Sequence, residues 1–293
     1  HKGTEHQQAD IKSRIKQLTE ELSSPKKGGR RSGPSHVIRA EGAAQICLVG
    51  PPNAGKSSLH ARLTGSRTEV APYPCTTHLP IPGMLSHEDI HFQLVDLPPV
   101  SDDFMEPWLV ATMHPADAAL LVIDVNDPEC VDQIPAIAQR LAEKKIFLSE
   151  HWPGLPGETM NPAGTDDPFR LDLPTLLIAN KCDLDPDPGE VEVLEELLGL
   201  QFPALTVSAE SGEGLDELGP FLFRALEIVR VYTKSPGKPP DLDKPFTVRH
   251  GDTVLDVARL VHRDIARDLK FARRWGANVY DGQQPGPDHP VED

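Results

Sequence analysis

The sequence has no apolar stretch long enough to cross a membrane. Hydrophobic residues make up 38% and charged residues 25% of the 293-residue chain, which is typical of a globular protein with a substantial core. The first ten residues, HKGTEHQQAD, are polar and lack the apolar core of a secretory signal. These absences argue against a transmembrane helix, and we expect a cytoplasmic protein that does not contact membranes.

Metal and disulfide signatures are also missing. The four cysteines stand far apart and form no CxxC pair, which argues against a zinc site and a disulfide framework. The twelve histidines show neither HExxH nor another ligand spacing. We therefore expect reduced cysteines and assign no catalytic role to any histidine.

Basic residues are scarce in the middle of the chain. Residues 46–240 hold 12 Lys/Arg against 30 Asp/Glu, whereas residues 1–45 hold nine against five and residues 241–293 hold eight against ten. Because phosphate binding needs a positive surface, a chain that grips nucleic acid over its whole surface is excluded. We expect no DNA binding, and we expect any RNA contact to be made by the terminal regions.

Changes in composition divide the chain. Residues 5–22 carry apolar side chains every three or four positions, which predicts an amphipathic helix, and residues 23–35 form a linker rich in Pro, Gly and basic residues. A second Pro-rich stretch begins at residue 235, after which a strand, a turn and a helix are predicted. The predicted units are an N-terminal helical segment with a basic linker (1–44), a central domain (45–234), a linker (235–243) and a small C-terminal unit (244–293).

Short apolar runs alternate with helical patterns in the central domain. The expected strands are 45–50, 90–96, 118–125, 174–180 and 203–209, the expected helices are 131–145, 189–200 and 214–233, and residues 151–168 are expected to form an exposed loop. This alternation is typical of an α/β fold with a doubly wound, mostly parallel sheet.

A phosphate-binding motif follows the first predicted strand. Gly50-Pro51-Pro52-Asn53-Ala54-Gly55-Lys56-Ser57 fits GxxxxGK[ST], and a predicted helix continues from Ser58. The glycines let backbone N–H groups surround phosphate oxygens, Lys56 adds a charge at the β- and γ-phosphates, and the Ser57 hydroxyl coordinates Mg²⁺. The motif predicts a nucleoside triphosphate site that uses Mg²⁺.

A second motif indicates which base is bound. Asn180-Lys181-Cys182-Asp183 follows another predicted strand, and a carboxylate there accepts hydrogen bonds from the ring N–H and the exocyclic amine of guanine, a donor pair that adenine lacks. Ser208-Ala209-Glu210 follows the next strand, where a backbone N–H can meet the guanine carbonyl. A polar turn is the alternative interpretation of either segment. In this order they favour GTP and GDP as ligands.

Two further Mg²⁺ ligands are expected near the strand 90–96. Asp96 ends this strand, from where its carboxylate can hold Mg²⁺ through water. Thr76 and Thr77 lie in the irregular segment 71–83, where a hydroxyl and an N–H can close over Mg²⁺ and the γ-phosphate, and Thr77 is the predicted ligand. Taken alone, an Asp at a strand end is more often a turn residue.

Taken together, these motifs resemble those of the TRAFAC GTPases and, within them, the Obg/DRG-type branch, where DRG denotes developmentally regulated GTP-binding proteins. Residues 50–59 and 72–83 resemble that branch's P-loop and first switch. Residues 4–22 resemble the N-terminal helical region of DRG proteins, and residues 244–276 resemble the TGS domain, a ubiquitin-like β-grasp module. The resemblance implies slow GTP hydrolysis with Mg²⁺ and association with the ribosome, RNA or translation factors.

The resemblance also implies a role for each matching residue. Lys56 matches the catalytic phosphate-binding lysine, Ser57 and the catalytic Thr77 the Mg²⁺ ligands, Asp96 the acid of the DxxG element, and Asn180 and Asp183 the base readers. Asn53 matches an asparagine that helps to hold a monovalent cation in potassium-stimulated relatives. A K⁺ requirement is therefore a hypothesis for this chain.

The sequence departs from the family pattern in three respects. The DxxG element ends in Pro99, which has no N–H to give the γ-phosphate, and Val100 stands where Ras-like enzymes carry a water-orienting Gln. We therefore expect slow turnover that needs a cation, a partner or a dimer. No added domain separates Asp96 from Asn180 as in eukaryotic DRG proteins, and the sequence ends at PVED before the strand that normally completes a TGS fold.

Two other functions stay open at this point. A nucleotide-gated binding module with negligible turnover is favoured by Pro99 and Val100, whereas an ATPase of the YchF type would require an altered NKCD motif. The sequence also offers two RNA footprints, the basic loop of Lys26, Lys27, Arg30 and Arg31, and a C-terminal set that would share one face of an unbroken helix, Arg259, Arg263, Arg267, Lys270 and Arg274. Interleaved aspartates favour a solvated face for the second set.

Overall fold

The computed structural model describes residues 38–66, 79–101, 104–156, 167–184, 199, 201–235, 237–276 and 280–293. These residues belong to one compact unit, His36–Asp293. The predicted N-terminal helix, the basic linker and almost all of the predicted helix 189–200 lie outside the described residues.

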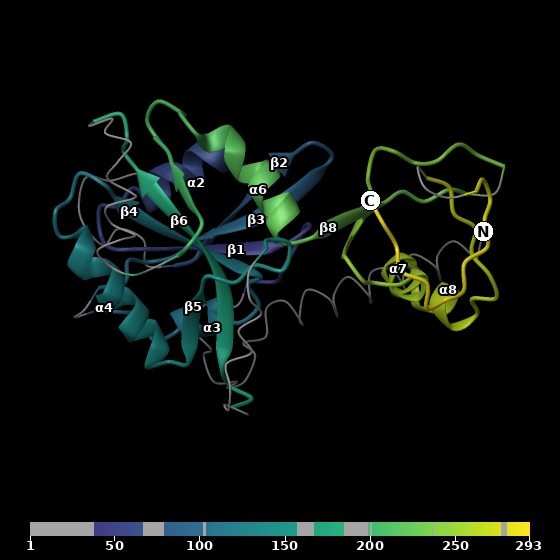
Figure 1. Ribbon diagram of the computed structural model, residues 1–293, viewed down its shortest axis with the longest axis horizontal. Coiled ribbons are helices and arrows are strands. Elements are labelled where there is room, and N and C mark those ends of the chain that lie inside the picture. The colour runs from purple at the N-terminus through teal and green to yellow at the C-terminus, as the bar shows by residue number, and fades with distance from the viewer. Residues whose placement is uncertain are drawn as a thin grey trace, which may run out of the picture. The chain divides into compact units, whose positions relative to one another are not determined.

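A seven-stranded sheet forms the centre of this unit (Figure 1). Its strands are β1 (Gln45–Val49), β2 (Ile81–His87), β3 (Ile90–Asp96), β4 (Ala118–Asp124), β5 (Ile146–Ser149), β6 (Leu171–Asn180) and β7 (Ala204–Thr206). The strand order is β2-β3-β1-β4-β6-β5, and β7 also pairs with β6. Only the β2–β3 pair is antiparallel among these described strands, so the predicted mostly parallel sheet is confirmed.

Helices cover both faces of the sheet, as Figure 1 shows. On one face lie α2 (Lys56–Thr64) and α6 (Leu218–Ala225), and on the other lie α3 (Leu109–Met113) and α4 (Cys130–Ala142). Successive strand residues point to opposite faces, so Ile46 and Leu48 enter the first core while Cys47 and Val49 enter the second. This arrangement is the predicted doubly wound fold.

Two strands of the sheet are not predicted by the sequence pattern. β2 contains Pro82 and Gly83, which are poor strand formers, but it lies at the sheet edge, where a missing N–H is tolerated. β5 has only four residues and therefore shows too little alternation to be recognised. The irregular segment expected at 71–83 is thus wrong from Ile81 onward.

The predicted helix 214–233 is wrong beyond Ala225. A short 3-10 helix, η1 (Leu215–Glu217), leads into α6, and Glu227 then adopts a left-handed φ of 51°. Residues Ile228–Val231, which include three β-branched side chains, form the strand β8. The apolar side chains of this stretch therefore belong to two elements, a helix with a repeat of 3.6 residues and a strand with a repeat of two.

The predicted exposed loop 151–168 is wrong at its beginning. Trp152 is only 1% exposed, and its indole Nε1 donates a hydrogen bond of 3.1 Å to the Thr175 carbonyl. Its ring also meets the Phe221 ring edge-on, with the centroids 5.2 Å apart. The large apolar area of a tryptophan favours burial even within a Gly- and Pro-rich segment.

The C-terminal residues form a small unit with a separate two-stranded sheet and two helices. β9 (Phe246–Arg249) pairs antiparallel with β8, and α7 (Val254–Val261) and α8 (Arg263–Arg267) follow. Val229, Val248 and Val257 form its buried core. The pairing joins residues on either side of the predicted linker 235–243.

An unbroken basic helix in this unit is ruled out by the structure. His262 separates α7 from α8 with an extended backbone, φ −168° and ψ 138°, and caps α8 by accepting the Asp264 N–H. Lys270 and Arg274 lie beyond the end of α8 in non-helical backbone. The condition under which the five basic side chains would share one helix face, an unbroken helix, is therefore not met.

Three cysteines, Cys47, Cys130 and Cys182, are free and buried. Cys75 lies outside the described residues. No helix in the described ranges is long and apolar enough to span a bilayer.

Candidate functional site

The motif residues gather at the carboxyl edge of the sheet. β1, β3, β4 and β6 are parallel neighbours, so the loops that follow them meet at one edge. Gly50 follows β1, and the strands β3, β4 and β6 end at Asp96, Asp124 and Asn180. This edge is where open α/β sheets bind their ligands.

Two glycines of the P-loop are required by close backbone approach. A Cβ on Gly50 would lie 2.2 Å from the Val122 carbonyl oxygen, so the loop passes directly over β4. Gly55 has φ +90°, and a Cβ there would lie 2.3 Å from Asn180 Nδ2. Asn53 also adopts a left-handed backbone, with φ 62°. The conformation of the loop is therefore tied to the neighbouring strands.

The P-loop lysine is buried inside its own loop. Lys56 is 6% exposed, and its Nζ donates to the carbonyl oxygens of Gly50 at 2.9 Å and Pro51 at 2.7 Å. These contacts direct the ammonium group toward the interior of the loop, where phosphate oxygens are expected. The remaining motif residues, Pro52, Ala54 and Ser58, complete the loop and the first turn of α2.

Two of the predicted Mg²⁺ ligands lie in contact. Ser57 Oγ donates a hydrogen bond of 2.6 Å to Asp96 Oδ2, while Asp96 Oδ1 is buried and has no hydrogen-bond partner among the described residues. Burial raises the pKa of Asp96, and the Ser57 hydrogen bond and the Lys56 charge offset part of that rise. A hydroxyl beside a carboxylate with such a buried oxygen fits a hard divalent cation. Thr76 and Thr77 lie outside the described residues.

The Asn180 side chain connects two loops. It is 1% exposed, its Nδ2 donates to the Ala54 carbonyl at 2.9 Å, and its Oδ1 accepts the Ala209 N–H at 3.0 Å. The P-loop and the Ser208-Ala209 turn are thus joined through one amide group. The structure brings Asn180 to the site as a connector, with both ends of its amide engaged by backbone.

The Asp183 carboxylate is exposed and is held in place by a buried hydroxyl group. Ser208 Oγ donates a hydrogen bond of 2.5 Å to Asp183 Oδ1 and accepts the Ser211 N–H at 2.9 Å. Ser208 itself is fully buried. The second carboxylate oxygen of Asp183 can therefore face a ligand while the first stays fixed.

Comparison with known proteins agrees with this geometry. A family model described as a 50S ribosome-binding GTPase matches residues 45–150, and a TGS domain model matches residues 229–293. Developmentally-regulated G-protein 2 of Arabidopsis thaliana is 27% identical over 343 positions, covering 100% of this chain and 85% of the relative. Developmentally-regulated GTP-binding protein 1 of Xenopus laevis is 26% identical over 343 positions, covering 100% and 92%. The chain is a DRG-type GTPase with a C-terminal TGS domain.

Other matches extend the comparison to archaea and to solved structures. An uncharacterised GTP-binding protein of Methanocaldococcus jannaschii is 26% identical over 342 positions, covering 100% of this chain and 86% of the relative. A point variant of S. thermophilus NFeoB bound to GDP·AlF4⁻ aligns with 21% identity and a TM-score of 0.43, covering 62% of each chain. The alignments with these two GTP-binding relatives, of M. jannaschii and A. thaliana, are longer than this chain, so the relatives contain additional residues.

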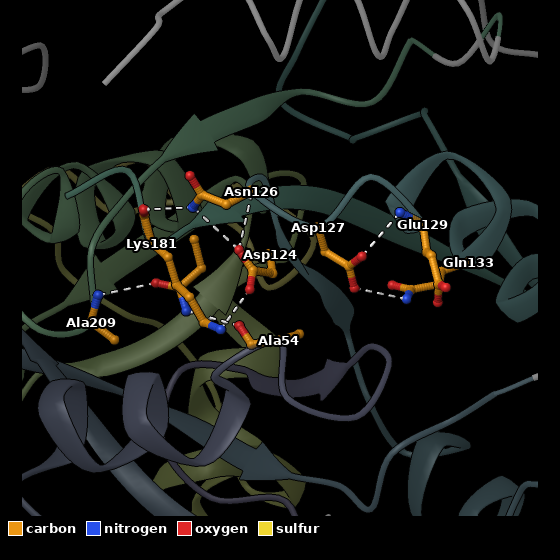
Figure 2. Close-up of polar contacts among 9 residues, drawn as sticks. Ala54, Asp124, Asn126, Asp127, Glu129, Gln133, Lys181 and Ala209 are labelled. Atoms are coloured by element: carbon orange, nitrogen blue, oxygen red, sulfur yellow. Dashed lines mark hydrogen bonds and ion pairs between the residues drawn. The ribbon is translucent and has the colours of Figure 1, made fainter. Parts of the chain in front are cut away.

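In this DRG-type GTPase, residues outside the sequence motifs hold the loop that follows β6. Asp124 Oδ2 pairs with Lys181 Nζ at 2.6 Å, and Asn126 Nδ2 donates to the Lys181 carbonyl at 3.0 Å, as Figure 2 shows. These contacts hold Lys181 in a left-handed backbone with φ 69°. Asp124 ends an apolar strand, the same signal that identifies Asp96.

The neighbouring Asp127 lies just before α4 and contacts its first turns. Its Oδ1 accepts the Glu129 N–H at 3.0 Å and its Oδ2 accepts Gln133 Nε2 at 3.1 Å (Figure 2). This carboxylate therefore fixes the loop that carries Asn126 to the helix that follows.

The segment after Asp96 is packed against the P-loop. The Val100 N–H donates to the Gly50 carbonyl at 3.1 Å, and the side chains of Leu97 and Val100 are fully buried. Pro99 is also buried and has no N–H. The first N–H after the two prolines is thus committed to the protein itself.

Proposed function

We propose that this DRG-type GTPase is a slow, K⁺-stimulated switch that converts GTP to GDP and phosphate and acts in the cytoplasm on the ribosome, RNA or translation factors. The observation that carries this proposal is the Asn180 amide, which joins the P-loop at Ala54 to the guanine loop at Ala209. A site built in this way sets the spacing between the phosphates and the base of one ligand.

Phosphate chemistry is assigned to the P-loop and its neighbours. Lys56 and the loop N–H groups would neutralise charge on the β- and γ-phosphates, and water would attack the γ-phosphorus in line with the leaving GDP. Mg²⁺ would be held by Ser57, by Thr77 and, through water, by Asp96, and it would draw charge from the phosphate oxygens. The buried Asp96 Oδ1, which no described residue hydrogen-bonds, supports this assignment.

Guanine specificity is assigned to two loops. Asp183, oriented by Ser208, would accept the ring N–H and the exocyclic amine, and the Ser208-Ala209 turn would face the guanine carbonyl. Asn180 and Lys181 would act by holding these loops, since their polar groups contact protein atoms.

Slow turnover is supported by the second-switch segment. Val100 supplies no group that could orient the attacking water, and its N–H is bonded to Gly50. The same observation favours a second candidate function, a nucleotide-gated binding module with negligible hydrolysis. The two candidates differ in phosphate release and not in GTP affinity.

Potassium dependence is assigned to Asn53. Its backbone is left-handed with φ 62°, and the residue is exposed at the edge of the P-loop. A side-chain carbonyl oxygen at this place would suit a large monovalent cation beside the phosphates.

Partner contact is assigned to the chain's terminal regions. In the TGS domain, Leu255, Arg259, Arg263, Ala266 and Arg267 line a surface hollow, and Phe271 and Trp275 nearby in sequence are exposed. Guanidinium groups and exposed aromatic rings suit phosphates and unstacked bases. The basic loop with Lys26, Lys27, Arg30 and Arg31 is the second assigned contact, and the description of the matching family model as ribosome-binding supports an RNA partner.

Phosphate release tests the proposal directly. We would incubate the purified chain and its Lys56→Ala and Asn53→Ala variants with Mg²⁺ and either GTP or ATP in matched K⁺ and Na⁺ buffers, and measure binding of both nucleotides in parallel. GTP-specific release that is faster in K⁺ and loses its K⁺ response in Asn53→Ala supports the proposal. GTP binding without release in either buffer indicates the binding module, and equal release in both buffers contradicts the role of K⁺.

A further inference from the structure

The β2–β3 hairpin runs from the nucleotide site to the TGS domain. Its register is continuous from the Ile81–Asp96 pair, at the edge where Asp96 meets Ser57, to the His87–Ile90 pair at the far end. In the sequence, Ile81 closely follows Thr77. One end of the hairpin contains the proposed Mg²⁺ ligand Asp96, and its other end is the turn formed by Glu88 and Asp89.

The tip of the hairpin is packed under α6. The His87 ring lies 5.8 Å from the Phe223 ring, centroid to centroid, and a Cβ on Gly219 would lie 2.7 Å from His87 Nδ1. Glu88 holds the turn with a left-handed φ of 49°. The tip is thus a fixed surface and not a free loop.

Arg230, in the TGS strand β8, is the centre of the contacts to this tip. Its guanidinium pairs with Glu88 and, at 3.3 Å, with Asp89, and it lies over the Phe223 ring with Cζ 4.9 Å from the centroid. It also pairs with Asp293 at 2.8 Å, and its side chain is only 20% exposed. The guanidinium therefore joins the hairpin, α6 and the C-terminal residues of the TGS domain.

Two further contacts attach the TGS domain to the same edge of the sheet. The Tyr232 hydroxyl donates to Asp89, and Arg249 of β9 pairs with Asp117 at 2.8 Å just before β4. The second oxygen of Asp117 accepts the Gln45 N–H at 2.8 Å, at the start of β1. Asp89, Asp117 and Gln45 lie at the amino ends of β3, β4 and β1. The carboxyl ends of the same strands form the nucleotide site.

We propose that Arg230 couples the TGS domain to the nucleotide state by clamping the tip of the β2–β3 hairpin. GTPase switch segments are ordered by the γ-phosphate and Mg²⁺, and the first switch leads directly into β2. A hairpin that is fixed at its tip provides a fixed anchor at its other end, so less conformational freedom is lost when the nucleotide engages that end. The clamp therefore favours the GTP-bound state over the GDP-bound state.

The coupling is reciprocal. If TGS docking strengthens GTP binding, then GTP strengthens TGS docking by the same factor, and a partner that pulls the TGS domain away lowers the preference for GTP. This inference rests on the proposed nucleotide site, because it assigns the first switch to the segment before β2.

The test compares Arg230→Met with Arg140→Met, each in the full chain. Methionine keeps most of the apolar stem of arginine, and Arg140 forms an exposed ion pair with Glu143 on α4, away from the hairpin. Dissociation constants for fluorescent GDP and for a fluorescent non-hydrolysable GTP analogue would be measured with Mg²⁺. Trypsin cleavage after the exposed Lys234, which follows β8 and precedes Ser235, would be monitored with and without each nucleotide.

We expect Arg230→Met to weaken analogue binding relative to GDP binding by about fivefold or more, the range of measured allosteric couplings. The analogue should slow cleavage after Lys234 in the unaltered chain and in Arg140→Met, but not in Arg230→Met. Asp89→Asn should act in the same direction, and the double variant should show less than the summed effect of the two single variants.

If Arg230→Met fails to fold, Tyr232→Phe takes its place in the test. This variant removes the hydroxyl that contacts Asp89 at the hairpin tip and keeps the ring. A ratio of affinities in Arg230→Met that stays within twofold of Arg140→Met would overturn the coupling. Absence of GTP binding in the unaltered chain would instead reject the nucleotide site on which it rests, so the two failures are distinguishable.

Discussion

At the scale of single residues, the site depends on polar side chains that hold one another. Ser208 fixes Asp183, Asn180 joins Ala54 to Ala209, and Asp124 holds Lys181. The Asp183 carboxylate is exposed, and the Ser208 side chain that holds it is fully buried. The choice of base should therefore respond to changes at this one carboxylate.

Replacing Asp183 by Asn should weaken GTP binding by on the order of 10²-fold, because hydrogen bonds to a charged group contribute about 1.5–3 kcal/mol. The amide has one acceptor for the two guanine donors. Isothermal titration with GTP, GDP and ATP would measure the change. Asp172→Asn, at the other end of β6 and paired with Arg170, is the matched control and should bind GTP normally; equal loss in both variants would contradict the assignment.

Cys47 should be unreactive in the folded protein. Its side chain is fully buried, and burial, helped by the charge of Asp117, raises the pKa of the thiol from 9.0 to about 12. Since the unfolded chain ionises first, the stability that Cys47 contributes is lost as pH rises from 9.0 toward about 12. Iodoacetamide at pH 8 followed by peptide mass spectrometry should label Cys47 only in denaturant, and labelling without denaturant would refute this.

At the scale of elements, the P-loop is held by contacts with strands distant in sequence. Gly50 passes over the backbone of β4, Gly55 packs on Asn180 at the end of β6, and Val100 after β3 bonds to Gly50. The conformation of the loop therefore depends on contacts with the sheet as well as on the loop's own sequence. Substitutions that disturb these approaches should affect folding and nucleotide binding together.

Gly50→Ala should abolish nucleotide binding and destabilise the fold. The added methyl group would meet the Val122 carbonyl at 2.2 Å, so the loop or β4 must shift. Gly65→Ala is the control, because Gly65 has φ +66° with no atom of the described residues within 4 Å of an added Cβ and should lose only about 1–2 kcal/mol for the left-handed backbone. Urea unfolding and fluorescent GDP binding would compare them, and equal behaviour would contradict the contact argument.

At the scale of the whole molecule, charge is distributed unevenly between the central part of the chain and its N-terminal region. The central residues 46–240 carry 12 basic against 30 acidic side chains, whereas residues 1–45 have an excess of four basic ones, nine against five. An RNA approaching this chain is repelled by its middle and attracted by its N-terminal region.

Neutralising the basic loop should therefore reduce the salt dependence of RNA binding. With Lys26, Lys27, Arg30 and Arg31 replaced by Ala, the slope of log affinity against log salt for a single-stranded RNA should fall by about 3, at roughly 0.7 per contact. Fluorescence anisotropy between 50 and 200 mM KCl would measure the slopes. If the fourfold Ala variant has the same salt slope as the control variant Arg140→Met, this loop is excluded as the RNA contact.

The motif residues and the fold class could be predicted because they depend on local order. A strand, a Gly-rich turn and a helix in sequence predict the P-loop from Gly50 to Ser57, and parallel strands place Asp96, Asn180 and Ser208 at one edge. The DRG-type resemblance follows from the same short segments. Each of these signals lies within a few consecutive residues.

Contacts between segments that are distant in sequence were decided only by the tertiary structure. β2 is a strand because it can pair with β3 at an edge, and residues 228–231 leave α6 for a strand because β9 is available as a partner. The same dependence applies to Trp152, to the Asp124–Lys181 pair and to Arg230 at the hairpin tip. Pattern and propensity act over neighbouring residues, whereas burial and ion pairing depend on partners that the folded chain brings together.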